Sequence, residues 1–496
     1  MNKYILAIDS GTTSNRAVLF NSYGQIANIS QLEIKQILPE SGWVEQNPEE
    51  LWADQKHVIK DVLKKQEITS KEISAIGITN QRETVVVWDK KSGLPVYNAI
   101  VWQDRRTAGF CDKLKKEGID KIIKEKTGLV VDAYFSASKI KWIIDNIPGA
   151  RKKAEEGKLA FGTIDTWLVW KLTKGGQHIT DVSNASRTML YNINKLEWDK
   201  ELLKVFEIPL SMLPEVKSSS EIYGYSHKNH FDNEIPLSGI AGDQQASLFG
   251  QMCIKKGMVK NTYGTGCFVM MNTGNKAVIS NNNLLTTIAW QIGKEVNYAL
   301  EGSIFIGGAV VQWLRDKLGI IKSSSEIESL AKKVENNGGV CFVPAFVGLG
   351  APHWDQYATG TIIGISQSTT NAHIARASLE AIALQSMDVI NTMIIDSGIN
   401  ISEIRVDGGA VMNNLLMQIQ SDLIQKKVVR PEITETTALG AAYLAGLAVG
   451  YWNNIDEIKN QWKAEKQFMP DTNIDQFTKL ISNWNKAIER SKHWNS

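Results

Sequence analysis

Short polar segments interrupt the apolar runs of this chain, and their residue types suit phosphate, metal and polyol chemistry. The segment Asp9-Ser10-Gly11-Thr12-Thr13-Ser14 separates two apolar runs, which predicts a strand, a turn and a second strand. Glycine lets backbone N–H groups approach phosphate oxygens, the hydroxyl groups add donors, and the aspartate can face a magnesium ion. The alternative is an ordinary hairpin rich in turn-forming residues.

A second turn of this kind, Gly264-Thr265-Gly266, occurs about halfway along the chain and precedes another apolar run. We interpret the two turns as parts of two half-chains that share one plan, with domains at residues 1–250 and 251–496. A third glycine cluster, at 406–410, leads from an apolar run toward Asn413. It can let an adenine or a ribose lie against the backbone, or it can be a tight strand–helix turn.

Adjacent charges of opposite sign stand in Asn80-Gln81-Arg82-Glu83, between two predicted strands. A guanidinium group donates and a carboxylate accepts, so together they can satisfy neighbouring hydroxyl groups of a polyol. The alternative is a plain ion pair. Trp102 can pack on the carbon backbone of such a ligand, although many tryptophans are core residues.

The segment 240–246 places Asp243 and Gln244 at the end of an apolar strand, immediately before a helix of small residues. A carboxylate in this position can take the proton from an attacking hydroxyl group. The alternative is that Asp243 is the N-cap of the helix. The sequence contains neither G-x-x-x-x-G-K-[ST] nor a G-x-G-x-x-G after a strand, so the common nucleotide-binding loops are absent.

The elements that must position these residues alternate between strands and helices, which predicts an α/β fold. Strands are predicted at 73–78, 84–88, 340–346 and 404–407, and helices at 49–65, 136–146 and 372–395. The uncharged stretch 436–454 is rich in glycine and alanine and predicts a buried helix, because a membrane span needs about 20 apolar residues.

Composition narrows the class of protein. The chain has 496 residues, a hydrophobic share of 43% and a charged share of 22%, as expected for a globular protein of two large domains. Its net charge of +2 argues against nucleic-acid binding. The N-terminus lacks the features of a signal peptide, so we expect a cytoplasmic protein without an integral membrane segment. The 4 cysteines include no C-x-x-C pair, which argues against a zinc site or a disulfide framework.

Together these segments resemble the FGGY-type carbohydrate kinases of the actin/hexokinase-like superfamily, and most closely its glycerol kinases. The resemblance spans nearly the whole chain, in residues 9–18, 78–89, 98–106, 134–146, 180–190, 238–251, 260–268, 360–380, 406–418 and 434–452. It implies an α/β fold of two actin/hexokinase-like (ribonuclease H-like) domains with an interdomain catalytic cleft. The segments NQRET, with Arg82, and GDQQ, with Asp243, together with the stretch around Trp102, are the ones that point to glycerol.

The resemblance also implies ATP and Mg²⁺, phosphorylation of glycerol to sn-glycerol 3-phosphate, and a role for each matching residue. Asp243 would be the general base. The residues implied to bind glycerol are Arg82, Glu83, Tyr134, Asp243 and Gln244, with Trp102 and Phe268 as an apolar wall. Those implied to bind ATP are Thr12, Thr13, Ser14 and Arg16 at the phosphates and Thr265, Gly308, Gln312, Gly409 and Asn413 around the nucleotide. Asp9 and Asp243 would face the metal, directly or through water.

The chain departs from the family pattern at Ser10, where glutamine is common, and at Asn15, where serine is frequent. The loop 225–234 lacks the glycine-rich basic sequence with which some members bind a sugar bisphosphate. It resembles the loop of members regulated by phosphotransfer, about one residue shorter, so we expect that a phosphocarrier protein can act on His230. The alternative is a surface histidine with no such role. The resemblance also implies a homo-oligomer, a dimer or a tetramer.

Two rival functions remain open at this stage. A nucleotide switch of the same superfamily, such as a filament or chaperone-like ATPase, would need no polyol pocket, and the combination of NQRET with GDQQ argues against it. A kinase for another small polyol or ketose is the second rival. ATP turnover with and without glycerol separates the first rival from a glycerol kinase, and a substrate panel separates the second.

Overall fold

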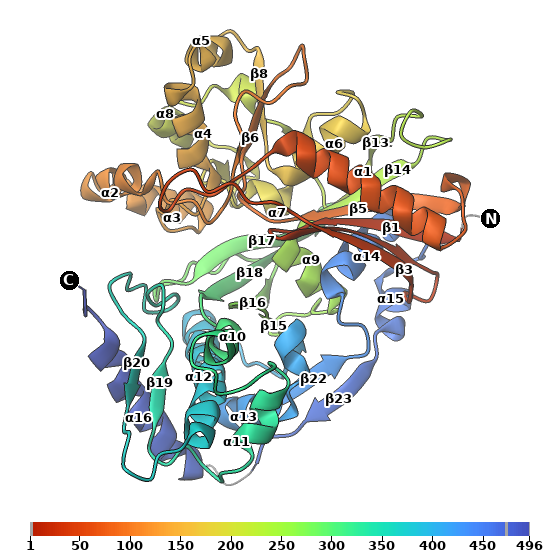
Figure 1. The fold of residues 1–496 in the computed structure, drawn as a ribbon. Helices are drawn as coiled ribbons and strands as arrows, with labels where there is room; N and C mark the ends of the chain where they lie inside the picture. The colour runs from red at the N-terminus through yellow and green to blue at the C-terminus, as the bar shows by residue number, and fades with distance from the viewer. Residues whose placement is uncertain (1–2, 472–474, 496) are drawn as a thin grey trace.

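The computed structural model describes residues 3–471 and 475–495, and its strands gather into a sheet that runs through both halves of the chain (Figure 1). Among these residues the sheet has 13 strands, in the order β23-β22-β21-β15-β16-β18-β17-β13-β14-β5-β1-β2-β3. Their bounds are β1 Tyr4–Ser10, β2 Ser14–Phe20, β3 Ile26–Glu33, β5 Ile73–Asn80, β13 Ser220–Tyr225, β14 Pro236–Gly242, β15 Val259–Tyr263, β16 Cys267–Gly274, β17 Leu285–Ile292, β18 Glu295–Ile304, β21 Glu403–Asp407, β22 Lys427–Pro431 and β23 Ala464–Phe468.

The two halves of the sheet repeat one strand plan, as the paired turns predicted. In the first half β1 is antiparallel to β2 and parallel to β5, while β2 is antiparallel to β3 and β5 is parallel to β14. In the second half β15 is antiparallel to β16 and parallel to β21, while β16 is antiparallel to β18 and β21 is parallel to β22. The turns at 11–13 and 264–266 therefore occupy equivalent positions.

Helices cover the sheet, and the predicted ones form close to their expected bounds. The longer helices are α1 Pro48–Lys65, α2 Ala108–Lys116, α3 Asp120–Thr127, α4 Ser136–Asn146, α6 Ile164–Leu172, α8 Lys200–Phe206, α9 Asp243–Gly250, α10 Ala309–Asp316, α12 Asn371–Ser397, α13 Asn414–Ile424, α14 Thr436–Ala448, α15 Ile455–Gln461 and α16 Asp475–Ser491. Helix α1 begins where the sequence supplies a cap, because Asn47 accepts hydrogen bonds from the N–H groups of Glu49 and Glu50 and Pro48 follows it.

Strand β1 is buried on both faces, which explains its continuous apolar sequence. Leu6 and Ile8 pack in the hydrophobic core that includes α1, whereas Ile5 and Ala7 pack in the core that includes α9 and α14. Helix α14 comes from the far end of the chain, yet it packs against β5, β14 and β1 of the first half. The two sequence halves are therefore interlocked at this point.

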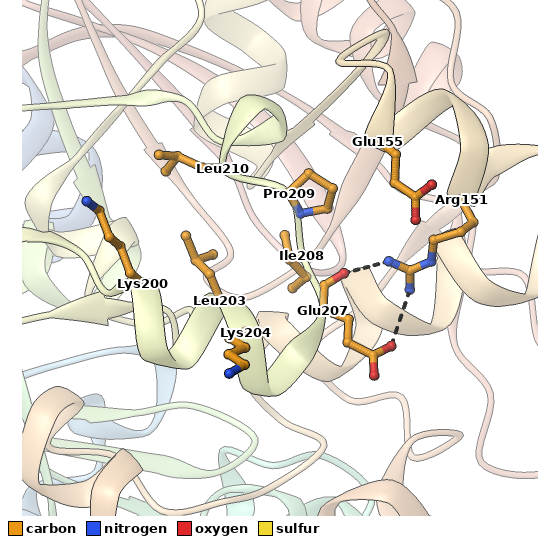
Figure 2. Close-up of a pocket in the computed structure, with 9 residues that line it drawn as sticks. All are labelled: Arg151, Glu155, Lys200, Leu203, Lys204, Glu207, Ile208, Pro209 and Leu210. Carbon is orange, nitrogen blue, oxygen red and sulfur yellow. Dashed lines mark hydrogen bonds and ion pairs between the residues drawn. The ribbon is translucent and has the colours of Figure 1, made fainter.

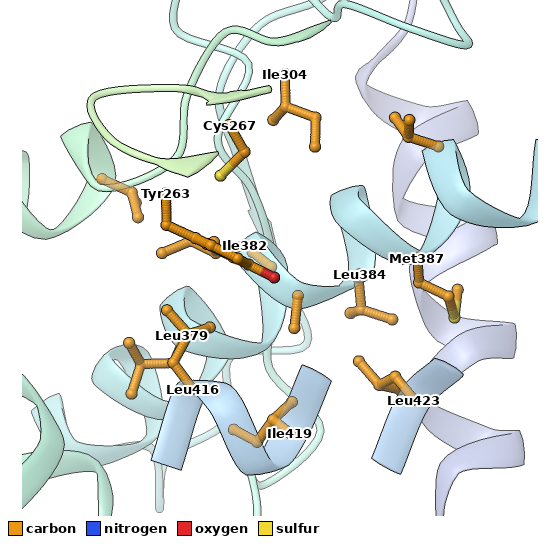
Figure 3. Close-up of a cluster of buried hydrophobic side chains, with 14 of the residues drawn as sticks. Tyr263, Cys267, Ile304, Leu379, Ile382, Leu384, Met387, Leu416, Ile419 and Leu423 are labelled. Carbon is orange, nitrogen blue, oxygen red and sulfur yellow. The ribbon is translucent and has the colours of Figure 1, made fainter. Parts of the chain in front are cut away.

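A separate large core fills the second half (Figure 3). Tyr263 at the end of β15 and Cys267 at the start of β16 face α12 residues such as Leu379 and Ile382, with α13 residues such as Leu416 packed beside them. The polar segment after residue 474 forms α16 on the outside of this core. There the buried Trp484 donates a hydrogen bond from Nε1 to Asp388 Oδ2 of α12 at 2.7 Å.

Two predicted elements are shorter than the sequence pattern indicated. The strand expected at 340–346 is only β19, Cys341–Val343, because Pro344 follows and cannot donate to a strand ladder. The helix expected at 436–454 ends at Ala448. All 4 cysteines are buried and free. Among the residues described, no helix is at once long enough and apolar enough to cross a bilayer.

Candidate active site

The two polar turns close their hairpins with backbone hydrogen bonds, and each carries an exposed threonine. Gly11 N–H donates to the Ser14 carbonyl at 2.9 Å, and Gly264 N–H donates to the Gly266 carbonyl at 2.9 Å. Thr13 and Thr265 are exposed. Both turns are hairpins, in agreement with the alternative interpretation. Because the turns occupy equivalent positions, each half of the chain has one turn with an exposed threonine hydroxyl group.

Arg82 and Glu83 lie in the irregular segment between β5 and β6 (Val86–Asp89) and are almost completely buried. Glu83 has a φ of 61°, in the left-handed region, so the backbone turns sharply here. Arg82 Nε forms an ion pair with Asp243 Oδ1 at 3.1 Å, and the terminal nitrogens of Arg82 donate to Glu301. Arg82 Nε also lies 3.9 Å from Glu83 Oε1, so the ion pair that we gave as an alternative for these two residues is present. The further ion pairs with Asp243 and Glu301 join Arg82 to other residues of the cluster.

Asp243 is the first residue of α9, and the N-cap of that helix is Gly242, without a capping side chain. The N-cap alternative for Asp243 is therefore wrong. Its Oδ1 accepts a hydrogen bond from Gln244 N–H at 2.7 Å and forms the ion pair with Arg82. Burial raises the pKa of this carboxyl, although Arg82 and Lys260 oppose the shift. A raised pKa suits a group that must accept a proton.

Aromatic side chains join the polyol residues to the first polar turn. The rings of Trp102 and Tyr134 meet edge to face, with centroids 5.4 Å apart. Trp102 also donates from Nε1 to Thr12 Oγ1 at 2.9 Å. Phe268 pairs with Ser303 across β16 and β18, two residues from Glu301 on the same face of the sheet. That face carries the carboxylate that binds Arg82.

The sequence analysis missed three charged residues of this cluster, Arg187, Lys260 and Glu301. Arg187 donates from Nε to Glu83 Oε1 at 2.6 Å and from Nη2 to Glu301 Oε1 at 3.0 Å. Lys260 donates from Nζ to Thr262 Oγ1 at 2.8 Å and also to the side-chain oxygen of Gln244. Each is a single charged residue within a segment of apolar or small residues, and this feature could have indicated a functional role from the sequence.

The residues predicted around the nucleotide divide into two groups. Thr265 and Gly308 are adjacent, because Gly308 N–H donates to the Gly264 carbonyl at 2.9 Å and Ala309 N–H donates to the Thr265 carbonyl at 3.1 Å. Gly409 follows Gly408, which has a φ of 90° and where an added Cβ would lie 2.5 Å from the Tyr263 carbonyl oxygen, so a side chain is excluded there. Gln312 and Gly409 are exposed, and Asn413 caps α13 through the N–H group of Leu416.

A comparison of the sequence with known protein families identifies the family of this chain. Residues 4–250 match the N-terminal domain of the FGGY family of carbohydrate kinases, and residues 259–449 match its C-terminal domain. The chain belongs to the FGGY family of carbohydrate kinases. The resemblance seen in the sequence motifs is thereby confirmed, and so is the two-domain kinase fold.

Several relatives of this FGGY kinase are glycerol kinases. Those of Burkholderia vietnamiensis and Chromobacterium violaceum are each 60% identical to it over 493 residues, which is 99% of both chains. A crystal structure of Plasmodium falciparum glycerol kinase with ADP is 39% identical, with a TM-score of 0.93 over 98% of both chains. A gluconate kinase of Lactobacillus acidophilus, 22% identical with a TM-score of 0.90 over 98% of both chains, shares the fold.

The acidic residues of the FGGY kinase that we predict to face a metal fit magnesium. Burial raises the pKa of Asp9 to about 7, opposed by Arg16 and reinforced by Asp243, whose charge acts on it. Two carboxylates that repel each other gain from a cation between them. Mg²⁺ is commonly held by one or two carboxylates together with substrate phosphates and water. In the described part of the chain no group of three or more metal-binding side chains occurs.

A surface pocket of the kinase lies outside this cluster. Figure 2 shows residues of α8 and of α5 (Ala150–Glu155) lining it, where Arg151 donates to the Glu207 carbonyl at 2.5 Å. Its lining contains no residue that the sequence analysis assigned to polyol, phosphate or metal. We therefore place the candidate active site at the Arg82–Asp243 cluster.

Proposed function

We propose that this FGGY kinase transfers the γ-phosphoryl group of ATP to a terminal hydroxyl group of glycerol, giving sn-glycerol 3-phosphate and ADP. The observation that carries the proposal is the contact of Arg82 with Asp243 at 3.1 Å, next to Glu83, Gln244 and the Trp102–Tyr134 pair. This cluster offers donors, acceptors and an apolar surface to a small polyol. The high identity to glycerol kinases over the full length supports glycerol as that polyol.

In the proposed reaction Asp243 accepts the proton of the attacking hydroxyl group. The hydroxyl oxygen forms a bond to the γ-phosphorus while the bond from this phosphorus to the β–γ bridging oxygen breaks. Arg82 and Gln244 N–H both bind Oδ1 of Asp243, so Oδ2 is the oxygen that faces the reacting hydroxyl. Phosphoryl transfer needs mainly positioning and charge stabilisation from a protein, which this cluster and the polar turns would supply.

Nucleotide binding is assigned to the two turns and the glycine cluster. Thr12, Thr13, Ser14 and Arg16 would bind the phosphates, and Thr265, Gly308, Gln312, Gly409 and Asn413 would surround the nucleoside. Asp9 and Asp243 would hold Mg²⁺, which when bound neutralises charge on the transferred phosphoryl group. Arg16 binds Glu435 at 2.8 Å, so this arginine must exchange a protein carboxylate for a phosphate when ATP binds.

A substrate panel tests the proposed function. We expect kcat/KM for glycerol to exceed that for xylulose, ribulose or gluconate by at least ~100-fold, because a wrong substrate leaves buried polar groups unpaired. The measurement is ADP release with each acceptor at saturating ATP and Mg²⁺. Equal rates across the panel would disprove glycerol specificity, and ATP turnover that no acceptor changes would favour a nucleotide switch.

His230 is the residue that we propose as the target of a phosphocarrier protein. It lies in the loop between β13 and β14, and β14 ends one residue before Asp243. Its Nε2 is hydrogen-bonded to the Lys171 carbonyl at 3.0 Å, and its ring meets Trp52 edge to face. Burial lowers the pKa of His230, which favours the neutral ring. Because Nε2 carries the proton that it donates to the Lys171 carbonyl, phosphorylation of Nε2 would require this hydrogen bond to break and that proton to leave for solvent, and it would add charge to the loop.

We expect a phosphoenolpyruvate-driven phosphocarrier system to label wild-type enzyme, to leave His230→Ala unlabelled and to change the activity of the wild type only. His227→Ala is the matched control, because its ring lies 6.4 Å from that of His230 in the same loop. Equal labelling of wild type and His230→Ala would refute the assignment. Unlabelled wild type would refute it as well, leaving His230 as a packing residue.

The homo-oligomer, the domain boundary at residue 250 and the cytoplasmic location stay predictions. The family matches end at residue 250 and resume at residue 259, which supports a boundary in that interval.

A further inference from the structure

One buried carboxylate from the second half of the chain, Glu301 on β18, binds both arginines of the proposed site. Arg82 donates from Nη1 to Glu301 Oε2 at 2.5 Å and from Nη2 to Oε1 at 2.9 Å. Arg187 donates from Nη2 to Oε1 at 3.0 Å. The side chains of Glu301 and Arg187 are fully buried. Such two-point bonds fix the plane of a guanidinium group as well as its distance.

Each arginine in turn binds one acidic residue of the proposed site. Arg82 Nε forms an ion pair with Asp243 Oδ1 at 3.1 Å, and Arg187 donates from Nε to Glu83 Oε1 at 2.6 Å. Glu301 is thus the branching point of two chains of polar contacts, made of hydrogen bonds and, between Arg82 and Asp243, an ion pair. One chain ends at the proposed base, and the other ends at a proposed glycerol ligand.

The charges of this cluster balance only when Glu301 is ionised. Arg82, Arg187 and Lys260 face three carboxylates, of which Glu301 is one and Asp243 and Glu83 are the others. Burial by itself raises the pKa of Glu301, but Arg187 and Arg82 outweigh burial and lower this pKa to about 2. Without Glu301 the two arginines would compete for Asp243 and Glu83, and both acidic groups would turn toward them.

We propose that Glu301 is a positioning residue of the polyol site, holding Arg82 and Arg187 so that Asp243 and Glu83 keep the orientation that a polyol requires. This inference rests on the proposed function. Glu301 touches no substrate in this scheme, because it acts through the two arginines. It also makes the polyol site depend on a strand of the second half, although the other members of both chains belong to the first half.

The test is Glu301→Gln, which keeps the shape of the side chain and removes its charge. We expect the KM for glycerol to rise about 10- to 100-fold, since bonds to charged groups are the strong ones, while the KM for ATP changes less than about 3-fold. Glycerol affinity measured by calorimetry without nucleotide should fall by the same factor as KM rises. Arg187→Lys, which keeps the charge but cannot bridge two carboxylates, should show the same selective loss.

Glu380→Gln on α12 is the matched control, because this buried carboxylate also binds one arginine, Arg376, at 2.8 Å. It should leave the KM for glycerol unchanged.

An unchanged glycerol KM in Glu301→Gln, or an equal change in the KM values for glycerol and ATP, overturns the proposal. If Glu301→Gln does not fold, Glu301→Asp replaces it, with the same expected selectivity and the same refuting result. If the wild type prefers another polyol, the substrate panel refutes glycerol as the substrate. The Glu301 variants are then assayed with the preferred polyol.

Discussion

Replacing Asp243 with asparagine lowers kcat by about 10²- to 10⁴-fold, the contribution of a positioned general base, while ADP binding is retained. Asparagine keeps the shape of the side chain and can still accept the hydrogen bond of Gln244 N–H, although it loses the ion pair with Arg82. It lacks the basicity to take the proton of the attacking hydroxyl group. Steady-state kinetics with glycerol and ATP, together with calorimetric titration of ADP, measure the two quantities.

The matched control for this prediction is Asp165→Asn. Asp165 is a buried aspartate in the first turn of α6 whose two oxygens accept hydrogen bonds from Thr163 and Thr180. Its replacement removes a buried carboxylate from the same half of the chain outside the proposed site, so kcat should stay close to that of the wild type. Near-normal turnover by folded Asp243→Asn would show that Asp243 is structural and that the proposed mechanism is wrong.

Replacing Gly440 with alanine is expected to lower the thermal midpoint by roughly 1–3 °C or more, because overpacking a tight interface costs on the order of 1–3 kcal/mol or more and the unfolding entropy of a chain of this length is about 1 kcal/mol/K. Gly440 is in α14 where this helix crosses α9. A methyl group there would lie 1.8 Å from the Ala246 carbonyl oxygen and 3.0 Å from the Gly250 backbone nitrogen, so one helix must move. Helix α9 begins at Asp243, so kcat should fall as well.

Gly109→Ala in α2 provides the comparison, since it is also a helical glycine but has no atom within 4 Å of the added carbon. Alanine favours a helix by up to about 1 kcal/mol over glycine, so this variant should be as stable as the wild type or slightly more stable. Differential scanning calorimetry measures both variants. A Gly440→Ala protein with the midpoint and kcat of the wild type would mean that the α9–α14 contact is looser than the structure indicates.

Local patterns in the sequence determined most of the elements and the family. Apolar runs and helical periodicity predicted α1, α4 and α12 to within a few residues, because these signals arise within one turn of a helix or along one strand. The polar turns at 11–13 and 264–266 were visible for the same reason, and the repeat of the strand plan followed from them. The motifs around Arg82 and Asp243 named two residues that the fold does bring into contact.

Only the tertiary structure decided which charges meet. Arg82 and Glu301 are 219 residues apart, and their pairing follows from the position of β18 in the joined sheet, which no local pattern encodes. The packing of α14 on strands of the first half depends in the same way on long-range contacts. An ion pair can be read from a sequence only when its partners are neighbours on one element. Across the two halves of this chain, the order of the strands determines that the buried Glu301 contacts both Arg82 and Arg187.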